Sequence, residues 1–429
     1  MWWIIFKYPK FYVTIVSTYK FGRIPKDIKM FIRLKHIFIY MLIIMDCMIR
    51  EKSILTNKNN LEEIFTIKDF PVSMTCVPKD FNKYKYKYLD MTYQICKDTG
   101  IIQLKKYPKL EDMYIFQHNF SYGELWNNLF KIFSNKINNI INNNNIKNIN
   151  ILEIGGADCI LANKIINLND NIGTYKIYEK NYRKKNINKK ICIIDKYFDN
   201  KTIINYNVNI ILHSHVLEHV WDPVEFISAI KKNMIVNNYH CFIVPNIKTL
   251  FKKKYTNALN FEHNFFIIEE YIDIILNNNN FRVIEKEYYL DHSIMYITVL
   301  EDSRIIKSFP NLYEENKRIA LDFYKYHINI IKKLNNKLSN FEGNIYLFGG
   351  HIFSQYLIMF GLNIDKIKCI IDNCPMKNKK KLYGTHFIIE YPNIIKNQNK
   401  VAIILKAGSY QNTLRKQFLS LNPKVVILE

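Results

Sequence analysis

From residue 150 onward, short apolar segments alternate with longer segments whose apolar residues recur at helical spacing. The short segments have the length of buried strands, and the longer ones are typical of amphipathic helices. One helix start is well marked, because Asp222 stands where an N-cap is expected and Pro223 takes the first helical position. This alternation predicts a parallel sheet covered by helices. The segments are 151–155, 157–168, 175–180, 190–198, 208–216, 222–234, 240–246 and 269–279.

Two further strand-like segments, 281–290 and 294–300, end this series and look like an antiparallel pair. A doubly wound sheet that ends with an inserted antiparallel strand is typical of class I methyltransferases, which this part of the chain resembles. The resemblance implies an α/β fold with a Rossmann-like core around a mixed seven-stranded sheet. A second strand-helix series starts at residue 344 and predicts a further Rossmann-like domain at the C-terminal end.

The first predicted strand ends in a pair of glycines before a helix, a pattern that lets a ligand approach the backbone. The cofactor of such enzymes, S-adenosylmethionine (SAM), needs a close approach of its methionine part, which Glu153, Gly155 and Gly156 would allow. Glu179 ends the second strand, where its carboxylate can accept hydrogen bonds from two ribose hydroxyls. Asp195 ends the third strand and is placed to meet the adenine amino group. Singly, each residue also fits a strand end without a ligand, but together they predict a SAM site.

The segment ILHSHVLEHV, residues 211–220, closely resembles one that is common in SAM-dependent methyltransferases. There a strand runs into a His-x-Leu-Glu-His-Val turn before a helix that starts with Pro. The resemblance assigns His215 to cofactor binding. The loop departs from the family, which usually has glycine where Ala157 and Cys159 stand. Both side chains are small, so we expect the loop to close but to bind SAM more weakly.

Residues 45–429 resemble the three-part sugar C-methyltransferase family, which includes enzymes that methylate dTDP-4-keto-deoxysugars. The resemblance implies a small-molecule partner, a nucleotide-sugar, and methylation of a carbon atom. O- or N-methylation of another sugar or metabolite is an alternative, as is a non-catalytic protein of this fold. The implied parts are an N-terminal extension (1–44), a zinc-binding-like module (45–112), a SAM domain (113–301), a helical connector (302–340) and a C-terminal Rossmann-like domain (341–429).

The N-terminal module keeps half of the family's cysteine pattern. In the family two Cys-x-x-Cys pairs bind zinc, whereas here Cys47 and Cys96 hold the first places while Arg50 and Thr99 hold the second. Structural zinc requires four thiolate or imidazole ligands. Even with Cys76 only three thiols are present, so we predict that the module has lost its zinc and keeps its shape by packing. The sequence predicts no other metal site.

The catalytic group of the family is a Tyr-x-Glu-His segment together with a His that follows the fourth strand. Glu262 and His263 match that segment, His219 matches the further His, and Asn260 replaces the Tyr. Removal of a carbon-bound proton beside a ketone needs a base, and histidine titrates near pH 6.5. A neighbouring glutamate can orient the ring and hold its tautomer. The resemblance therefore assigns catalysis to His219, Glu262 and His263, with Asn260 beside the substrate.

Two more segments are expected to contact the substrate. In the family the stretch that matches residues 113–130 carries aromatic side chains that close over SAM and substrate, which makes His118 and Tyr122 candidates. We interpret Trp126, in the same stretch, as a core residue. In the C-terminal domain His351 follows a Gly-Gly turn that helps to bind the nucleotide-sugar in the family. The lysines between 377 and 381 could meet a pyrophosphate by charge, although a solvated loop explains them equally well.

Composition excludes several classes of function. The formal net charge is +23, but the basic residues follow no nucleic-acid-binding motif, so no nucleic-acid partner is predicted. The apolar run at 37–45 is shorter than the roughly 20 residues that cross a bilayer, so no membrane partner is predicted. Eight scattered cysteines suit a reducing, cytoplasmic compartment. We interpret residues 1–44 as an extension upstream of a start at Met45 or Met48; no feature indicates an oligomeric state.

Overall fold

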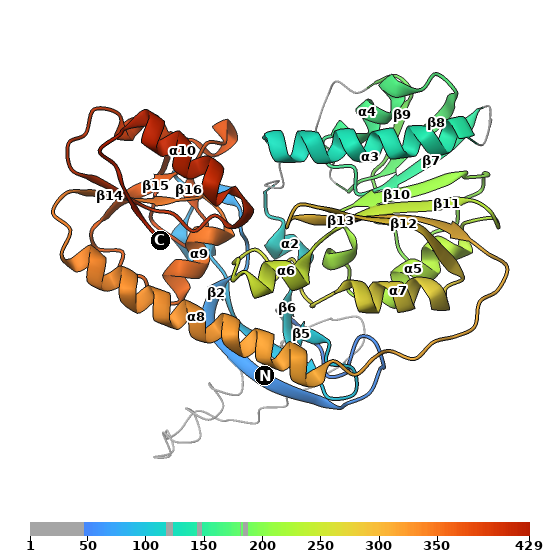
Figure 1. Cartoon of the computed structure of the whole chain (residues 1–429), viewed down its shortest axis with the longest axis horizontal. Coiled ribbons are helices and arrows are strands. Elements are labelled where there is room, and N and C mark those ends of the chain that lie inside the picture. Colours follow the sequence, from blue (N-terminus) through green and yellow to red (C-terminus); the bar gives the residue numbers. More distant parts are fainter. Residues whose placement is uncertain (1–46, 117–122, 144–147, 181, 183–187) are drawn as a thin grey trace, which may run out of the picture. The chain divides into compact units, whose positions relative to one another are not determined.

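A mixed seven-stranded sheet forms the centre of the computed structural model, which describes residues 47–116, 123–143, 148–180, 182 and 188–429 (Figure 1). Strand β13 runs antiparallel to both of its neighbours, β11 and β12, whereas β7 to β11 pair in parallel. This topology confirms the class I methyltransferase core predicted from the sequence. In spatial order the strands are β12 (Phe281–Tyr289), β13 (Ser293–Leu300), β11 (Tyr239–Pro245), β10 (Ile210–Ser214), β7 (Ile149–Ile154), β8 (Ile172–Tyr178) and β9 (Ile191–Ile194).

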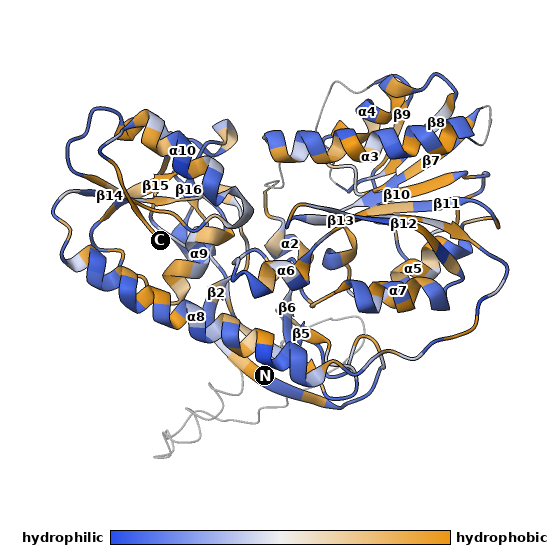
Figure 2. Ribbon diagram, in the orientation of Figure 1, coloured by the Kyte–Doolittle hydropathy of each residue, from blue (hydrophilic) through white to orange (hydrophobic). Residues whose placement is uncertain are grey.

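Helices cover both faces of this sheet (Figure 1). Helices α3 (Glu124–Asn143) and α4 (Ile160–Leu168) lie on one face, and α5 (Pro223–Lys232) and α7 (Glu269–Asn278) lie on the other. Successive side chains of a strand point to opposite faces, so Ile211 packs in the core with α5 and α7 and Leu212 in the core with α3 and α4. Figure 2 shows the hydrophobic strands between helices that mix polar and apolar residues.

The N-terminal module is built on an antiparallel sheet of β2 (Leu61–Pro71), β4 (Tyr88–Cys96) and β5 (Ile102–Leu104). Its last strand pairs with a segment of the methyltransferase core, because Gln103 forms an antiparallel bridge with Phe265. The smaller elements are β1 (Cys47–Ile49), β3 (Cys76–Val77), η1 (Lys83–Lys85), β6 (Lys106–Pro108) and α2 (Leu110–Met113). The module therefore holds the segment that carries Glu262 and His263.

The C-terminal domain has a parallel five-stranded sheet, as the second strand-helix series predicted. Its strands are, in spatial order, β17 (Ile389–Glu390), β15 (Ile367–Ile371), β14 (Asn344–Phe348), β18 (Val401–Ile404) and β19 (Val426–Leu428). Helix α8 (Tyr313–Ser339) precedes it, so the connector becomes helical only from Tyr313 onward. The remaining elements are η2 (Leu217–His219), α6 (Ile247–Lys252), α9 (Ile352–Met359), η3 (Pro375–Lys377), β16 (Lys381–Leu382), η4 (Pro392–Ile395), η5 (Gly408–Tyr410) and α10 (Gln411–Leu421).

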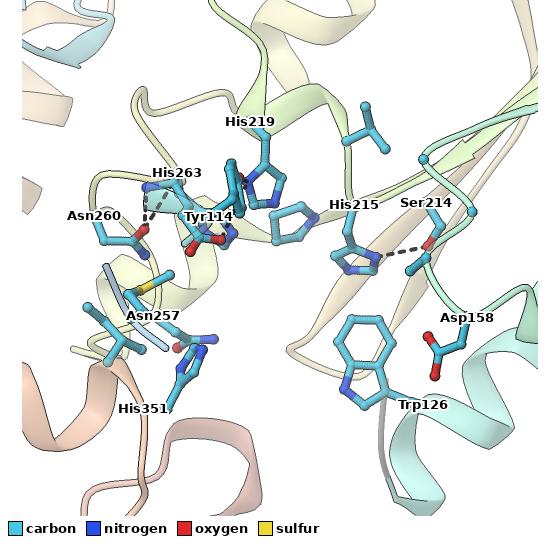
Figure 3. A pocket seen from close by; sticks show the side chains of 18 of the residues that line it. Tyr114, Trp126, Asp158, Ser214, His215, His219, Asn257, Asn260, His263 and His351 are labelled. Atoms are coloured by element: carbon cyan, nitrogen blue, oxygen red, sulfur yellow. Dashed lines mark hydrogen bonds and ion pairs between the residues drawn. The ribbon is translucent and has the colours of Figure 1, made fainter. Parts of the chain in front are cut away.

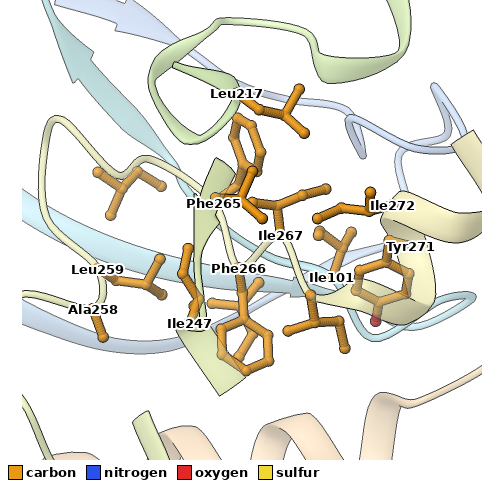
Figure 4. Packing of buried hydrophobic residues seen from close by; sticks show 14 of the residues in the cluster. Ile101, Leu217, Ile247, Ala258, Leu259, Phe265, Phe266, Ile267, Tyr271 and Ile272 are labelled. Carbon is orange, nitrogen blue, oxygen red and sulfur yellow. The ribbon is translucent and has the colours of Figure 1, made fainter. Parts of the chain in front are cut away.

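Residues Met48–Glu429 form one compact unit, in which a single buried cluster includes residues of all three parts. Figure 4 shows Ile101 of the N-terminal module beside Phe265, Phe266 and Ile267 of the core. Tyr356 of α9 belongs to the same cluster. The segment before α7 is therefore fixed by packing from both sides. Among the helices of the described residues, none has the length and apolar character needed to cross a membrane.

Candidate active site

A cavity of about 1230 Å³ opens at the carboxyl ends of β7, β8 and β10. Ligands of open α/β sheets bind at this edge, where the strand order changes direction. All three parts of the chain line the cavity. Figure 3 shows side chains of the core and of the C-terminal domain pointing into it. Representative lining residues are Tyr107 of the N-terminal module, Tyr114, Gly155, Glu179, His219 and His263 of the core, and His351, Lys377 and Tyr410 of the C-terminal domain.

The glycine loop after β7 lies in the cavity wall. Gly155 has a φ of 74°, and a Cβ there would lie 2.6 Å from a methyl of Val216. A Cβ on Gly156 would lie 2.5 Å from the Ile177 side chain. Both glycines are thus required by the protein's own packing, and both line the cavity.

Ala157 and Cys159 also have left-handed backbone conformations, with φ of 43° and 58°. These are the two positions where the resembled family has glycine. Residues with a Cβ pay a conformational cost in this region. The loop therefore adopts the backbone conformation that favours glycine, although Ala157 and Cys159 stand at these positions.

The Glu179 carboxylate lies directly beside this loop. Its Oε2 accepts a hydrogen bond from the Ala157 amide at 2.8 Å, and the residue lines the cavity. Burial raises the pKa of the Glu179 carboxyl, and the hydrogen bond from Ala157 opposes that rise. The carboxylate is thus positioned at the end of β8, where the sequence placed a ribose-binding acid.

Glu153 supports the loop from below. It is 2% exposed, and its Oε2 accepts a hydrogen bond from the Tyr175 hydroxyl at 2.8 Å. Burial raises the pKa of its carboxyl to about 8, although the Tyr175 hydrogen bond lowers it. Glu153 therefore has a hydrogen-bond partner inside the protein, and it also lines the cavity.

Asp195 does not line the cavity. Its exposed side chain pairs with Lys180 at 3.3 Å between Oδ1 and Nζ. The cavity is lined instead by the five residues that follow Asp195, Lys196 to Asn200. The Asp195 carboxylate is close enough to Glu179 to help raise the pKa of that carboxyl, but an aromatic residue such as Phe198 takes its place in the cavity wall.

A second group of polar residues gathers deeper in the cavity, around His219 and His263 (Figure 3). Their rings lie 5.0 Å apart between centroids, and His219 Nδ1 is 3.9 Å from Glu262 Oε2. The structure thus brings the three predicted catalytic residues together. Burial lowers the pKa of His263, so its ring is neutral at neutral pH.

Asn260 shapes the loop that presents this group. Its side-chain oxygen accepts hydrogen bonds from the Glu262 amide at 2.8 Å and from the His263 amide at 3.1 Å. The residue also lines the cavity. Its carbonyl oxygen is therefore engaged in a turn, which a tyrosine at this position could not form.

Tyr114 was not singled out from the sequence. Its hydroxyl lies 3.2 Å from His219 Nδ1, and burial raises the pKa of that hydroxyl. It belongs to the same segment as the two candidates His118 and Tyr122, which lie outside the described residues. The aromatic content of that segment was the available signal, and the structure brings a tyrosine hydroxyl to the histidine although Asn260 replaces the expected one.

His215 connects the two groups. It has a φ of 54°, and its ring contacts the hydroxyls of Ser214 and Ser293, each at 3.0 Å. Burial lowers the pKa of His215. Trp126, which the sequence analysis interpreted as a core residue, lines the cavity, and the centroid of its ring lies 4.7 Å from that of His215. Its Nε1 donates a hydrogen bond to the Tyr410 hydroxyl at 3.0 Å, so it links α3 to the C-terminal domain.

The C-terminal wall contains His351, at the start of α9, as the resemblance implied. The lysine cluster contributes less than expected. Lys377 lines the cavity but pairs with Asp372 at 3.1 Å, and Lys379 turns to Glu390. Two of the four lysines that could meet a pyrophosphate thus have their charge offset by carboxylates.

Arg50, which replaces a zinc-binding cysteine, has become a buried tether. Its guanidinium donates to the Asn264 side chain at 2.9 Å and to the Trp221 carbonyl at 2.7 Å, and it stacks on the Trp221 ring. Cys76 donates instead to the Gly350 carbonyl at 3.1 Å. Arg50 therefore connects the module to both segments that carry the predicted catalytic histidines. Loss of zinc stays a prediction.

Comparisons with known proteins found distant structural matches. No protein-family model and no curated protein matches the chain. A putative SAM-dependent methyltransferase from Listeria monocytogenes is 12% identical and matches over 36% of this chain and 92% of its own, with a TM-score of 0.30. A SAM-dependent methyltransferase from Clostridium acetobutylicum ATCC 824 is 10% identical over 40% of this chain and 92% of its own, with a TM-score of 0.32.

Human N-acetylserotonin methyltransferase in complex with SAM is 12% identical over 35% of this chain and 47% of its own, with a TM-score of 0.30. Each of these structures covers less than half of this chain. The fold assignment therefore comes from the strand order of the sheet, and the site is argued from its own residues.

Proposed function

We propose that the protein is a SAM-dependent methyltransferase that acts on a small molecule. The observation that carries this proposal is the Glu179 carboxylate beside the glycine loop, at the cavity edge of a class I methyltransferase sheet. The residues fit the cofactor, because Gly155 and Gly156 line the cavity and Glu179 can accept from a ribose diol. When bound, SAM supplies an electrophilic methyl group.

We further propose that the acceptor is a nucleotide-activated keto-deoxysugar and that the methylated atom is a carbon beside the ketone. The cavity supports this, since its 1230 Å³ exceeds the roughly 300–1,000 Å³ of ordinary ligand pockets and its far wall comes from the C-terminal domain. O- or N-methylation of another metabolite needs the same base and stays the alternative. A cytoplasmic location also stays a prediction.

The chemistry of the histidine group fits removal of a proton. His263 Nδ1 lies 3.3 Å from the Ala258 carbonyl oxygen, which can only accept, so this nitrogen carries the ring's proton. The other ring nitrogen, Nε2, then has the lone pair that takes the proton from the acceptor carbon. Loss of that proton leaves the electron pair on the acceptor as an enolate. Glu262, next to His219, stabilises the charge that the histidine pair gains.

Calorimetry with SAM tests the cofactor site. The wild-type protein should bind SAM, and Glu179→Ala should weaken binding about 10- to 100-fold, because two charge-assisted hydrogen bonds are lost. Glu225→Gln, which changes another carboxylate of the cavity wall, serves as the matched control and should bind normally. Absence of SAM binding by the wild type would refute the proposal.

Product analysis by mass spectrometry tests the acceptor. A panel of nucleotide-sugars incubated with SAM should yield one product that is heavier by a methyl group, and fragmentation locates the methylated atom. His263→Ala should keep SAM affinity and lose turnover. If His263→Ala instead lost SAM affinity, the histidine group would belong to the cofactor site.

A further inference from the structure

One buried carboxylate in the cavity region has no role in the steps described above. Glu218 is part of the η2 turn between β10 and α5, and its side chain is fully buried. No other described residue donates a hydrogen bond to either of its carboxylate oxygens. A buried carboxylate without a partner is costly, and buried charges are normally paired or bound to a metal.

Two imidazoles lie beside this carboxylate. One ligand atom each from Glu218, His219 and His263 falls within 4.8 Å of the others. His219 Nε2 is 3.9 Å from Glu218 Oε1. Around a tetrahedral zinc with bonds near 2.1 Å, ligand atoms lie about 3.4 Å apart. Side-chain rotations that move each ligand atom by about an ångström would therefore bring the three atoms to one ion.

In each imidazole, Nδ1 has the kind of hydrogen-bond partner that is found in metal-ligating histidines. Such histidines direct their second ring nitrogen to a carboxylate, a backbone carbonyl or water. His263 directs Nδ1 to the Ala258 carbonyl, and His219 directs Nδ1 to the Tyr114 hydroxyl, with the Glu262 carboxylate 3.9 Å away. These contacts leave the Nε2 edge of His219 facing Glu218.

We propose that Glu218, His219 and His263 form a binding site for a divalent transition-metal ion, for which Zn²⁺ is the reference probe. Two imidazoles and one carboxylate are a ligand set that zinc and other late first-row metals accept while an open position remains. That open position would face the acceptor, since both histidines line the cavity. The site was not predicted from the sequence, which indicated no metal.

The site has a consequence for the proposed function, although it does not depend on it. A histidine whose lone pair is on a metal cannot accept a proton. In the metal-loaded protein the carboxylate of Glu262 is the remaining base near His219, and the ion would draw electron density from an acceptor oxygen. Metal binding is measured without SAM or acceptor, so failure of one proposal is distinguishable from failure of the other.

The test uses the full chain, stripped with a chelator that is then removed. Titration with Zn²⁺ and metal analysis of the dialysed protein should give one ion per chain. Co²⁺ in place of zinc should show visible ligand-field bands without the thiolate charge-transfer band that cysteine ligands would add. Glu218→Gln and His263→Ala should each weaken Zn²⁺ binding by at least about 100-fold, more than the loss of a supporting contact around a ligand.

Two controls keep the result interpretable. Glu225→Gln should bind Zn²⁺ like the wild type, and Cys96→Ser separates the site from a zinc retained in the N-terminal module. Unfolding curves show whether each variant is folded. If Glu218→Gln does not fold, His263→Ala tests the site in its place. The proposal is overturned if the wild type binds no Zn²⁺, if Glu218→Gln binds it as tightly as the wild type, or if only Cys96→Ser loses it.

Discussion

At the scale of single residues, the glycine loop holds a conformation that its sequence disfavours. Ala157 has a φ of 43° and donates its amide proton to Glu179. For a residue with a Cβ, this conformation costs roughly 1–2 kcal/mol of folding free energy. Glycine avoids that cost, but its more flexible unfolded chain offsets about 0.4–1 kcal/mol of the gain. We therefore expect Ala157→Gly to raise the free energy of unfolding by about 0.5–1 kcal/mol, measured by urea denaturation.

Cys159→Gly provides the contrast, because its backbone is equally left-handed but its side chain is 1% exposed. Removing a buried side chain forfeits its packing and leaves a cavity. We expect this variant to lose about 1 kcal/mol in spite of the backbone relief. Equal effects of the two substitutions would show that the backbone conformation does not control the stability of this loop.

Glu153 predicts a pH dependence of stability. The pKa of its carboxyl is about 8 in the folded protein, against an ordinary value of 4.5. Between these values the unfolded chain has released a proton that the folded protein retains, so stability falls as pH rises through this window. At about 1.4 kcal/mol per pKa unit, the loss has an upper bound of roughly 5 kcal/mol.

The neutral variant Glu153→Gln should remove this dependence. Its free energy of unfolding relative to the wild type should increase from pH 5 to pH 8.5 and then level off. Denaturant titrations at several pH values measure the difference. A difference that stays constant over this range would mean that the Glu153 carboxyl titrates normally.

Several of the residues that sequence reasoning found lie at or just after strand ends, whereas Glu262 and His263, in the loop between α6 and α7, came from the family resemblance. Glu179 and His219 follow apolar runs, so their strands could be counted and their edge of the sheet inferred. Tyr114 follows no strand of the large sheet, and Glu218 follows the same strand as His219, but the contacts of both side chains depend on tertiary packing. Asp195 shows the limit of the method, since a strand end places the backbone but does not determine where the side chain points.

At the scale of elements, the start of α5 links stability to the active-site turn. Asp222 accepts hydrogen bonds from the amides of Val224 and Glu225, each at 2.9 Å, and Pro223 occupies the first turn. Loss of such a cap costs about 1 kcal/mol, within a range of 0.5–2 kcal/mol. Asp222→Ala should lower the free energy of unfolding by this amount.

Asn is an equally good cap residue, so Asp222→Asn should retain most of the stability. Thermal and urea unfolding of the two variants side by side measure the cap alone. If Asp222→Asn were as destabilised as Asp222→Ala, the charge of Asp222 near Arg50 would be the important feature, because that charge contributes to the pKa of Arg50.

The elements of the two sheets could be predicted because their periodicity is strong. The antiparallel β12–β13 pair and the capped α5 were expected within a few residues of their bounds. The small elements of the N-terminal module could not be predicted from the sequence, since β3 and β6 have only two or three residues and depend on distant partners. Strand β3, for example, pairs with β16 of the C-terminal domain.

At the scale of the whole molecule, three distant segments meet at one carbonyl group. The Leu259 oxygen, next to Asn260 of the catalytic segment, lies 2.9 Å from the Tyr93 hydroxyl and 2.5 Å from the Tyr356 hydroxyl. The two hydroxyls are 2.7 Å apart, and both rings are fully buried. Tyr93 comes from β4 of the N-terminal module and Tyr356 from α9, so this triad joins the three parts at the edge of the site.

A double-mutant cycle measures this coupling. Tyr93→Phe and Tyr356→Phe each remove one hydroxyl and keep the ring, so each should cost about 1–2 kcal/mol of unfolding free energy. The two hydroxyls contact the same Leu259 oxygen and also each other. The double variant should therefore lose less unfolding free energy than the two single variants lose together, and the difference should be at least about 0.5 kcal/mol. Urea denaturation of the four proteins gives the cycle. Strict additivity would mean that the hydroxyls act independently, and the Leu259 carbonyl would then not couple the outer parts of the chain through the catalytic segment.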